Sequence, residues 1–328
     1  MASEIRVSVV VPTVNRPTLL ADCLNDLLNQ DLDREMYEII VVCDGPDTST
    51  QKVVAAMARD TIVPVRFRQL PTRSGPAAAR NQGWRSASGE LIVFTDDDCR
   101  PATSWLSAFW AAYLHNKGNC AFTGKVIIPL PNPEQITDHD FNTQHLADAE
   151  FITANCACPK KILELTGGFD ERFTMAFRED SDLQFNLLSN GINIKYIVEA
   201  IVVHPIRKVK WGHSLKEQRK GHFNALLYKK FPVLYQTRIG QAPPLRYYFM
   251  IVTLLLGLLY FAIDRPVAGY IHILIWLALW LEFSYQRLKF TSRTTSHILE
   301  MLATSAIIPF LSVYWHIRGL IRFRTIFF

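Results

Sequence analysis

The sequence predicts an α/β protein with a mostly parallel sheet flanked by helices, followed by an α-helical membrane region. Three observations support this prediction. Apolar, β-branched runs alternate with segments of helical periodicity in the N-terminal part of the chain. Acidic or polar clusters directly follow several of these runs, where α/β sheets bind their ligands. Two almost continuously apolar segments occupy residues 245–263 and 267–283.

The individual elements follow from local pattern. Residues 7–12 read VSVVVP, a short run typical of a buried parallel strand, and residues 18–29 place apolar side chains at a helical period. Residues 129–150 hold three prolines and many polar side chains, which predicts a mobile loop. The remaining expected strands are 38–43, 65–70, 91–95 and one or two within 192–204, and the remaining expected helices are 48–59, 75–86, 160–165 and 180–189.

Composition limits the classes of partner. The net charge of +5 is too small to indicate a nucleic-acid partner, and the basic residues gather at 207–230, 287–293 and 318–324 beside apolar segments, as they do in proteins that meet an anionic membrane. Residues 1–6 carry no signal-peptide pattern. Six cysteines include no CxxC pair, which argues against zinc and predicts reduced, buried thiols in a cytosolic domain.

The acidic triplet Asp96–Asp97–Asp98 directly follows the expected strand 91–95. Three adjacent carboxylates repel one another unless a cation is present, and a hard divalent ion such as magnesium or manganese would relieve that repulsion. An isolated triplet is more often a solvated turn, so this interpretation depends on other motifs in the same domain.

Two further patterns support a functional site. Small residues surround Arg80 at the start of the expected helix 75–86, where an arginine can address phosphate. Glu179 and Asp180 open another helix, whose dipole favours ionised carboxylates that can accept a proton from a hydroxyl. Taken singly, the small residues around Arg80 also fit a helix that only packs on the sheet, and the acids at 179 and 180 also fit an ordinary helix start.

Together and in this order, these segments resemble the family 2 glycosyltransferases with the glycosyltransferase-A fold. The resemblance covers roughly residues 5–205. It is carried by the segments VSVVVPTVNRP, EIIVVCDG, GPAAARNQG, GELIVFTDDD, ITANCACPKKILELTGGFDERF and REDSDL. It implies a metal-dependent, inverting transfer of sugar from a nucleoside-diphosphate sugar, most simply a UDP-sugar.

The resemblance also implies roles for the donor and metal residues. Thr13 and Asp44 would contact the nucleobase, and Asp96 would contact the ribose and the water shell of the metal. Asp98, the second acid of the D-x-D pattern, would bind the metal directly. His204 would be a further metal ligand, a donor that suits manganese better than magnesium.

On the acceptor side the resemblance implies that Asp180 is the general base. Asn155, Gly168 and Glu179 would lie in the segments that line the acceptor. Single displacement would then invert the anomeric configuration, because Asp180 removes the acceptor's proton while the oxygen attacks from the face opposite the leaving group.

Two departures from the family pattern have consequences. The second strand ends Cys43-Asp44-Gly45-Pro46 where relatives commonly show Asp-Asp-Gly-Ser, so a single acid carries the base contact. The Q-x-x-R-W signature of processive polymer synthases is missing, since residues 217–222 read EQRKGH. We therefore expect addition of one sugar or few to the acceptor.

Three regions are expected: a cytosolic nucleotide-sugar domain (1–206), an amphipathic interfacial helix with a linker (207–244), and a membrane region (245–328). Residues 211–231 alternate basic and apolar side chains, which fits either a helix on an anionic leaflet or a basic helix packed on its own domain. A catalytic pocket at the interface suits a membrane-associated, lipid-linked glycan acceptor.

Charge placement predicts the membrane topology. With a cytosolic catalytic domain at the cell membrane, residues 245–263 would exit and residues 267–283 would return, which leaves Arg287, Lys289 and Arg293 inside. Residues 298–314 form a third, weaker apolar segment, re-entrant or spanning, and the same rule favours a re-entrant or interfacial hairpin. A buried helical hairpin in a soluble protein is the alternative for all of these segments.

Three other functions remain open. A nucleotidyltransferase would share the sheet, although the glycine-rich start typical of that class is replaced by PTVNR at residues 12–16. A transferase acting on polyprenyl phosphate needs no base, because its phosphate nucleophile is already ionised. A non-catalytic membrane scaffold would not need the intact acids.

Overall fold

The computed structural model describes residues 4–240 and 244–326, which form two compact units. The first unit contains the chain up to Pro129 together with His145–Ile206, and the second contains Leu130–Gln144 and the chain from Arg207 onward. Residues 130–144, which lie within the expected catalytic domain by sequence, thus cluster with the C-terminal region.

The first unit is built on one mixed sheet. β1 lies between β2 and β4, parallel to both, and β3 extends the parallel part beyond β2. β7 pairs antiparallel with β4 and β6, and β8 runs parallel to β6. In sheet order the strands are β3 (Val65–Gln69), β2 (Tyr37–Cys43), β1 (Val7–Thr13), β4 (Leu91–Phe94), β7 (Cys156–Pro159), β6 (Ala121–Ile127), β8 (Ile194–Val203) and β5 (Arg100–Pro101).

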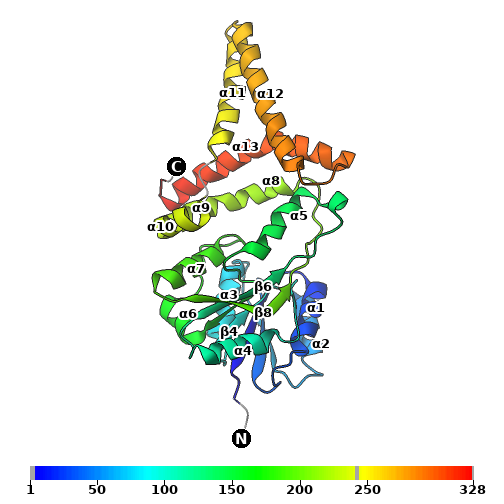
Figure 1. The fold of residues 1–328 in the computed structure, drawn as a ribbon, viewed down its shortest axis with the longest axis vertical. Helices are drawn as coiled ribbons and strands as arrows, with labels where there is room; N and C mark the ends of the chain where they lie inside the picture. The colour runs from blue at the N-terminus through cyan, green and yellow to red at the C-terminus, as the bar shows by residue number, and fades with distance from the viewer. Residues whose placement is uncertain (1–3, 241–243, 327–328) are drawn as a thin grey trace. The chain divides into compact units, whose positions relative to one another are not determined.

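Helices cover both faces of this sheet (Figure 1). Alternate β1 side chains enter different cores: Val9 and Val11 pack with one set of helices, and Val10 with the other. Gly83 allows the second set to approach closely, since a Cβ there would lie 2.3 Å from a Val10 methyl. The first set is α1 (Pro17–Leu28), α2 (Thr48–Met57) and α4 (Trp105–His115), and the second is α3 (Pro76–Arg85), α6 (Lys160–Thr166) and α7 (Glu179–Ser189).

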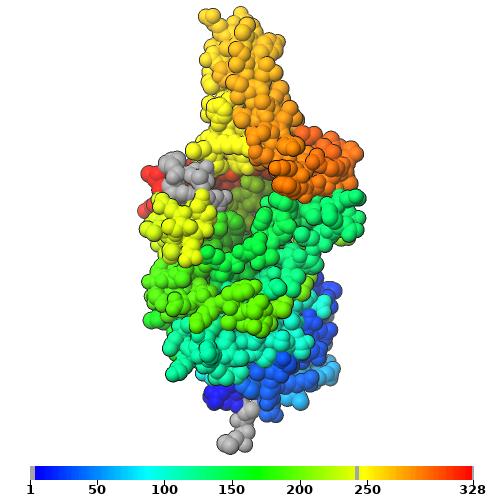
Figure 2. Space-filling model, viewed as in Figure 1, coloured from blue at the N-terminus to red at the C-terminus, as the bar shows by residue number. Residues whose placement is uncertain are grey.

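The second unit contains three helices that are long and apolar enough to cross a membrane: α11 (Leu245–Ala262), α12 (Pro266–Leu288) and α13 (Thr295–Phe323). α11 and α12 form a hairpin, and α13 lies across its base (Figure 1). On the face shown in Figure 2, the outer part of the hairpin is a column that no other element covers. The shorter helical segments are η1 (Pro133–Gln135), α5 (Asp138–Thr143), α8 (His213–Glu217), η3 (Gln218–His222), α9 (Phe223–Lys230), α10 (Pro232–Leu234) and η4 (Tyr235–Ile239).

Two expectations about this unit are corrected. The predicted mobile loop contains α5, which begins with a capping box between Thr137 and Asp140 and is tied to α12 by the Asp138–Arg287 ion pair. Residues 298–314, for which the sequence favours a re-entrant or interfacial hairpin over a span, form no hairpin and belong to one continuous helix, α13, which passes through Pro309. Local composition misled in both places, because contacts with distant residues stabilise these elements.

Candidate active site

The carboxyl ends of β1, β2 and β4 bring the polar residues of the first unit together. Val10 of β1 pairs with Phe94 of β4, and Thr13 pairs with Cys43 of β2. Thr13, Asp44 and the acidic triplet therefore emerge at one edge of the sheet, as expected for parallel neighbouring strands.

Asp97, the middle acid of the triplet, faces inward. Its carboxylate accepts hydrogen bonds from the Thr13 hydroxyl at 2.7 Å and from Arg16 at 3.0 Å, and its side chain is almost fully buried. Burial raises the pKa of Asp97, while Arg16 and Thr13 oppose that rise. Asp97 thus connects the triplet to the end of β1, and the hydroxyl proton of Thr13 is used in that hydrogen bond.

Asp98 lies beside His204, at the end of β8. The short β5 pairs Arg100 with Val203, and this register carries His204 to the triplet. Asp98 Oδ1 and His204 Nε2 are 3.8 Å apart, beyond hydrogen-bond distance but close enough for two ligands of one ion. Both side chains are buried, and the other ring nitrogen of His204, Nδ1, has no hydrogen-bond partner among the described residues.

The donor atoms of Asp98, Cys99 and His204 all lie within 4.8 Å of one another. Burial, reinforced by Asp96 and Asp98, raises the pKa of the Cys99 thiol well above its usual range. A protonated thiol is a poor ligand for a hard cation, whereas a carboxylate with an imidazole suits manganese. The residues present therefore fit a divalent ion held by Asp98 and His204, and Cys99 is a neighbour that sequence reasoning did not identify.

Arg80 joins the triplet to the start of α7. Its Nη2 lies 2.7 Å from Asp96 Oδ1, and its Nη1 lies 3.2 Å from Glu179 Oε1. The guanidinium is buried and lies 5.6 Å from the centre of the Phe169 ring. Both terminal nitrogens are thus engaged by protein acids, so Arg80 acts here as a bridge between two parts of the site.

The start of α7 carries the two adjacent acids. Arg178 precedes them in the left-handed conformation, with φ of 73°, and turns the chain into the helix. Glu179 is buried against Arg80, whereas Asp180 is partly exposed and accepts a hydrogen bond from the Ser181 amide at 2.7 Å. Burial raises the pKa of both carboxyl groups, and the charge of Asp180 further raises the pKa of Glu179.

Asp44, which follows β2, fixes the backbone in front of α3. Its carboxylate accepts the backbone N–H groups of Ser74 at 2.7 Å and of Gly75 at 3.0 Å, which fixes the chain just before α3. Gly75 has φ of +96°, and a Cβ there would lie 2.6 Å from the backbone of Thr174. The single acid after β2 thus orders the start of the helix that carries Arg80.

Two residues expected in the segments that line the acceptor make internal contacts. Asn155 is fully buried: its Oδ1 accepts from the Trp105 indole, and its Nδ2 donates to the carbonyl groups of Lys125 and Ala200. Gly168 is buried with φ of +72°, and a Cβ there would lie 2.7 Å from Trp84 Nε1. Both positions thus contribute to the packing between the sheet and its helices.

Sequence reasoning also missed two supporting side chains. Arg16 pairs with Asp97, and Asn81 donates to the Phe169 carbonyl at 2.8 Å while its Oδ1 accepts the Phe169 N–H at 3.0 Å. Asn81 follows Arg80 directly, so its place beside a site residue was the available signal. Nothing local indicates Arg16, whose partner lies 81 positions away.

Comparison with known proteins finds a family model that matches the N-terminal part of the chain. Residues 8–169 match the model of glycosyl transferase family 2. The chain is 34% identical over 119 residues to the GalNAc(5)-diNAcBac-PP-undecaprenol beta-1,3-glucosyltransferase of Campylobacter jejuni, covering 35% of this chain and 38% of that protein. It is 25% identical over 221 residues to the glycosyltransferase AglE of Haloferax volcanii, covering 65% and 70%. The alignment thus spans well under half of the first relative's length.

Solved structures show the same fold. The mannosyltransferase PcManGT of Pyrobaculum calidifontis, in complex with GDP-Man and Mn²⁺, is similar with a TM-score of 0.55 at 20% identity, covering 98% of this chain and 87% of that one. TarS residues 1–349 of S. aureus, in complex with UDP, is similar with a TM-score of 0.50 at 17% identity, covering 92% and 90%.

Proposed function

We propose, from the match of residues 8–169 to the family 2 glycosyltransferase model, that the protein is a metal-dependent, inverting and non-processive glycosyltransferase. Its donor is a nucleoside-diphosphate sugar, most simply a UDP-sugar. Its acceptor is a hydroxyl of a membrane-associated, lipid-linked glycan. The domain faces the cytosol at the cell membrane.

One observation carries the proposal. The carboxylate–imidazole pair of Asp98 and His204 lies in the same site as Asp180, because Arg80 connects Asp96 of the triplet to the acid next to Asp180. A metal-binding pair close to a partly exposed carboxylate supports displacement at a sugar carbon attached to diphosphate. The similar folds with bound UDP, or with GDP-Man and Mn²⁺, support the same donor class.

Asp98 and His204 would hold the divalent ion, manganese or magnesium. Once bound, such an ion stabilises the negative charge that develops on the departing nucleoside diphosphate. Thr13 and Asp44 stand at the strand ends where the nucleobase would lie, and Asp96 would meet the ribose. We assign Arg80 to positioning rather than to direct phosphate contact, because Asp96 and Glu179 already occupy its terminal nitrogens.

Asp180 would accept the proton of the acceptor hydroxyl. As the O–H bond breaks, the oxygen forms its bond to the anomeric carbon, and the bond from that carbon to the diphosphate oxygen breaks on the opposite face. Glu179 would support this step indirectly, because its ion pair holds Arg80 in place. The Campylobacter relative, whose name describes a substrate linked to undecaprenol diphosphate, supports a lipid-linked acceptor.

The test is Asp180→Asn in the full chain, assayed with UDP-sugars and lipid-linked acceptors. Asparagine keeps the shape but cannot take the proton, so transfer should fall by roughly 10²–10⁴-fold. Nucleoside-diphosphate binding with manganese, measured by calorimetry, should persist. Asp33→Asn is the matched control, since Asp33 is exposed and accepts only a local backbone bond.

Three outcomes would count against the assigned chemistry. Transfer at the wild-type rate in Asp180→Asn would favour a phosphate nucleophile, as on polyprenyl phosphate. Loss of nucleotide binding would place Asp180 in the donor site. Release of inorganic diphosphate by the wild-type protein would indicate a nucleotidyltransferase.

A further inference from the structure

We infer that α13 does not cross the membrane: it lies in the plane of the interface, with one face packed on the protein and its opposite, apolar face in the lipid. The chain then crosses the bilayer twice, through α11 and α12. This inference concerns the second unit alone and does not rest on the proposed reaction.

The first argument is that α13 packs lengthwise on the helical segment 213–230. Near its start, Glu300 Oε1 accepts the Gly212 amide at 2.6 Å. Toward its end, Gly319 approaches so closely that a Cβ would lie 2.6 Å from the His222 carbonyl, and the Phe323 carbonyl accepts Lys229 Nζ at 2.7 Å. The two segments therefore run side by side over most of their lengths.

This packing makes a spanning α13 costly. The segment 213–230 carries the exposed basic residues Lys216, Arg219 and Lys229. If α13 crossed the bilayer, its packed partner would enter the hydrocarbon with it, and a charged side chain at the bilayer centre is strongly unfavourable. The same contacts cover part of the apolar face of this segment, where Leu226 and Leu227 are buried.

The second argument is the outer face of α13. Its exposed large side chains recur every three, four or eight residues, which places them in one stripe along the helix. The stripe extends over 23 residues, or about 33 Å at helical rise. An apolar stripe of this length needs a partner, and none of the described residues covers it. It consists of Leu299, Ile307, Phe310, Tyr314, Ile317 and Ile321, which are 39–73% exposed.

The third argument is the level at which α13 meets the hairpin. Arg246 and Glu282 form an ion pair at the base of the hairpin, and Asp264 and Arg265 are exposed at its tip. The helix between Arg246 and Asp264 is about 27 Å long, close to the ~30 Å hydrocarbon thickness. The charged layer at Arg246–Glu282 therefore marks one membrane interface.

α13 touches the hairpin close to that layer. Trp280 Nε1 donates to the Leu302 carbonyl at 2.9 Å, and the rings of Tyr248 and His316 lie 6.3 Å apart. Both hairpin residues are within two positions of the Arg246–Glu282 pair. A helix that crosses the hairpin at this level, as α13 does in Figure 1, lies in the interface.

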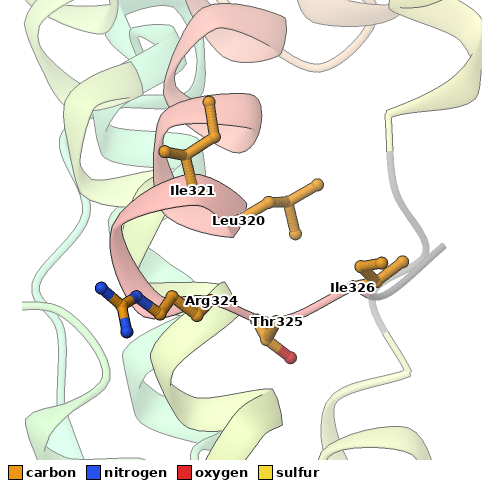
Figure 3. A pocket seen from close by; sticks show the side chains of 5 residues that line it. All are labelled: Leu320, Ile321, Arg324, Thr325 and Ile326. Carbon is orange, nitrogen blue, oxygen red and sulfur yellow. The ribbon is translucent and has the colours of Figure 1, made fainter.

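Charge at the end of the stripe fits lipid phosphate. Arg318 and Arg322 are exposed, and the Arg318 guanidinium lies 5.1 Å from the Trp315 ring. Figure 3 shows the groove where α13 ends: Leu320 and Ile326 present apolar surface while the Arg324 guanidinium points away from it. This separation of apolar and cationic groups is typical of helices at an anionic leaflet.

The first experiment measures sidedness with single introduced cysteines in the full chain. All six native cysteines are buried, so the wild-type protein supplies the background. The variants Lys52→Cys, Asp264→Cys and Ile326→Cys each place one thiol at an exposed position. Each variant is labelled with a membrane-impermeant maleimide in sealed proteoliposomes of one predominant orientation. The labelled fraction of Ile326→Cys should equal that of Lys52→Cys, because both thiols lie on the same side of the membrane, whereas the thiol of Asp264→Cys lies on the other side. Labelling of Ile326→Cys together with Asp264→Cys would overturn the inference.

The second experiment measures depth. A fluorophore on Leu299→Cys, Ile307→Cys or Ile317→Cys is quenched by lipids with the quencher placed shallow or deep in the acyl chain. An interfacial α13 should give the same shallow depth at all three positions, whereas Leu274→Cys in the outer part of α12 should be deep. A maximum of depth at Ile307, with Leu299 shallow, would overturn the inference because it describes a spanning helix.

Discussion

The acidic triplet after β4 divides its carboxylates between two tasks. Asp97 is turned inward to Thr13 and Arg16, whereas Asp98 lies beside His204. This division arises because the triplet leaves a strand, and neighbouring side chains there point in different directions. The D-x-D spacing thus separates two acids that can meet ligands from one that holds the turn.

Removal of either proposed metal ligand should weaken metal binding. Asp98→Ala should abolish transfer while the protein stays folded, and His204→Ala should lower the apparent manganese affinity by about 10-fold or more. The measurement is transfer rate against manganese concentration. Cys99→Ala is the control, because its protonated thiol is not assigned as a ligand; a Cys99→Ala titration shifted as far as that of His204→Ala would contradict this assignment.

The pH dependence of transfer should reflect Asp180. Burial raises its pKa and Arg178 lowers it, so the carboxylate forms as pH rises through a range above the ordinary ~3.9 of aspartate. Arg178→Asn removes the positive charge and tolerates the left-handed backbone, so the acid limb of kcat should move to higher pH by roughly one unit. Arg178→Lys keeps the charge and should leave the limb unchanged. A limb that stays in place in Arg178→Asn would assign it to another group.

At this scale the sequence identifies acids better than their partners. The triplet, Arg80, Glu179 and Asp180 were recognisable because they stand at strand ends and helix starts. The same pattern carries no information on the 99 positions that separate Arg80 from Glu179. The partners of Asn155 could not be predicted for a related reason, since only the fold reveals that three distant elements bond to its side-chain amide.

Among the elements, the turn between α6 and α7 depends on two consecutive glycines with different surroundings. Gly167 and Gly168 both have positive φ, of 81° and 72°. A Cβ at Gly167 would meet nothing within 4 Å, whereas one at Gly168 would collide with Asn81 and Trp84. Backbone conformation and packing are therefore separable at neighbouring positions.

Alanine at these two glycines should give unequal losses of stability. Gly167→Ala should lower the free energy of unfolding of the first unit by about 1–2 kcal/mol through backbone strain alone. Gly168→Ala should cost about 1–3 kcal/mol more, as overpacking of a close-packed core does. Denaturant unfolding in detergent measures both. Equal losses would mean that the α3 side chains move aside freely.

The parallel half of the sheet was predictable from sequence and the antiparallel half was less so. The strands near residues 7, 38 and 91 have nearly continuous apolar runs, the strand near residue 65 alternates apolar and polar side chains, and each lies within one or two residues of its expected bounds. β7 reads CACP, too short for a period, and α4 is apolar on nearly all sides. Tertiary pairing, rather than local preference, sets these elements.

For the whole molecule, the exposed hairpin determines how firmly the protein is held in a membrane. The apolar 18-residue stretches of α11 and α12 are each only 17% buried, and many of their apolar side chains are exposed. The full chain should therefore stay in the membrane pellet after washing with alkaline carbonate and leave it only in detergent. The measurement is immunoblotting of both fractions beside a peripheral marker protein. Release by carbonate would mean that another protein covers the hairpin.

The Asp138–Arg287 ion pair also sets an order of events during synthesis. Arg287 binds Asp138, Ser214, Thr304 and Ser305 together, and its partner Asp138 precedes it by 149 positions. At roughly 5–20 residues per second, a ribosome needs about 7–30 s to cover that distance. All strands up to β8 have therefore been synthesised before α12 and α13, the packing partners of the segment 130–144, exist. Packing of that segment within the second unit is therefore completed only after the C-terminal region has been made.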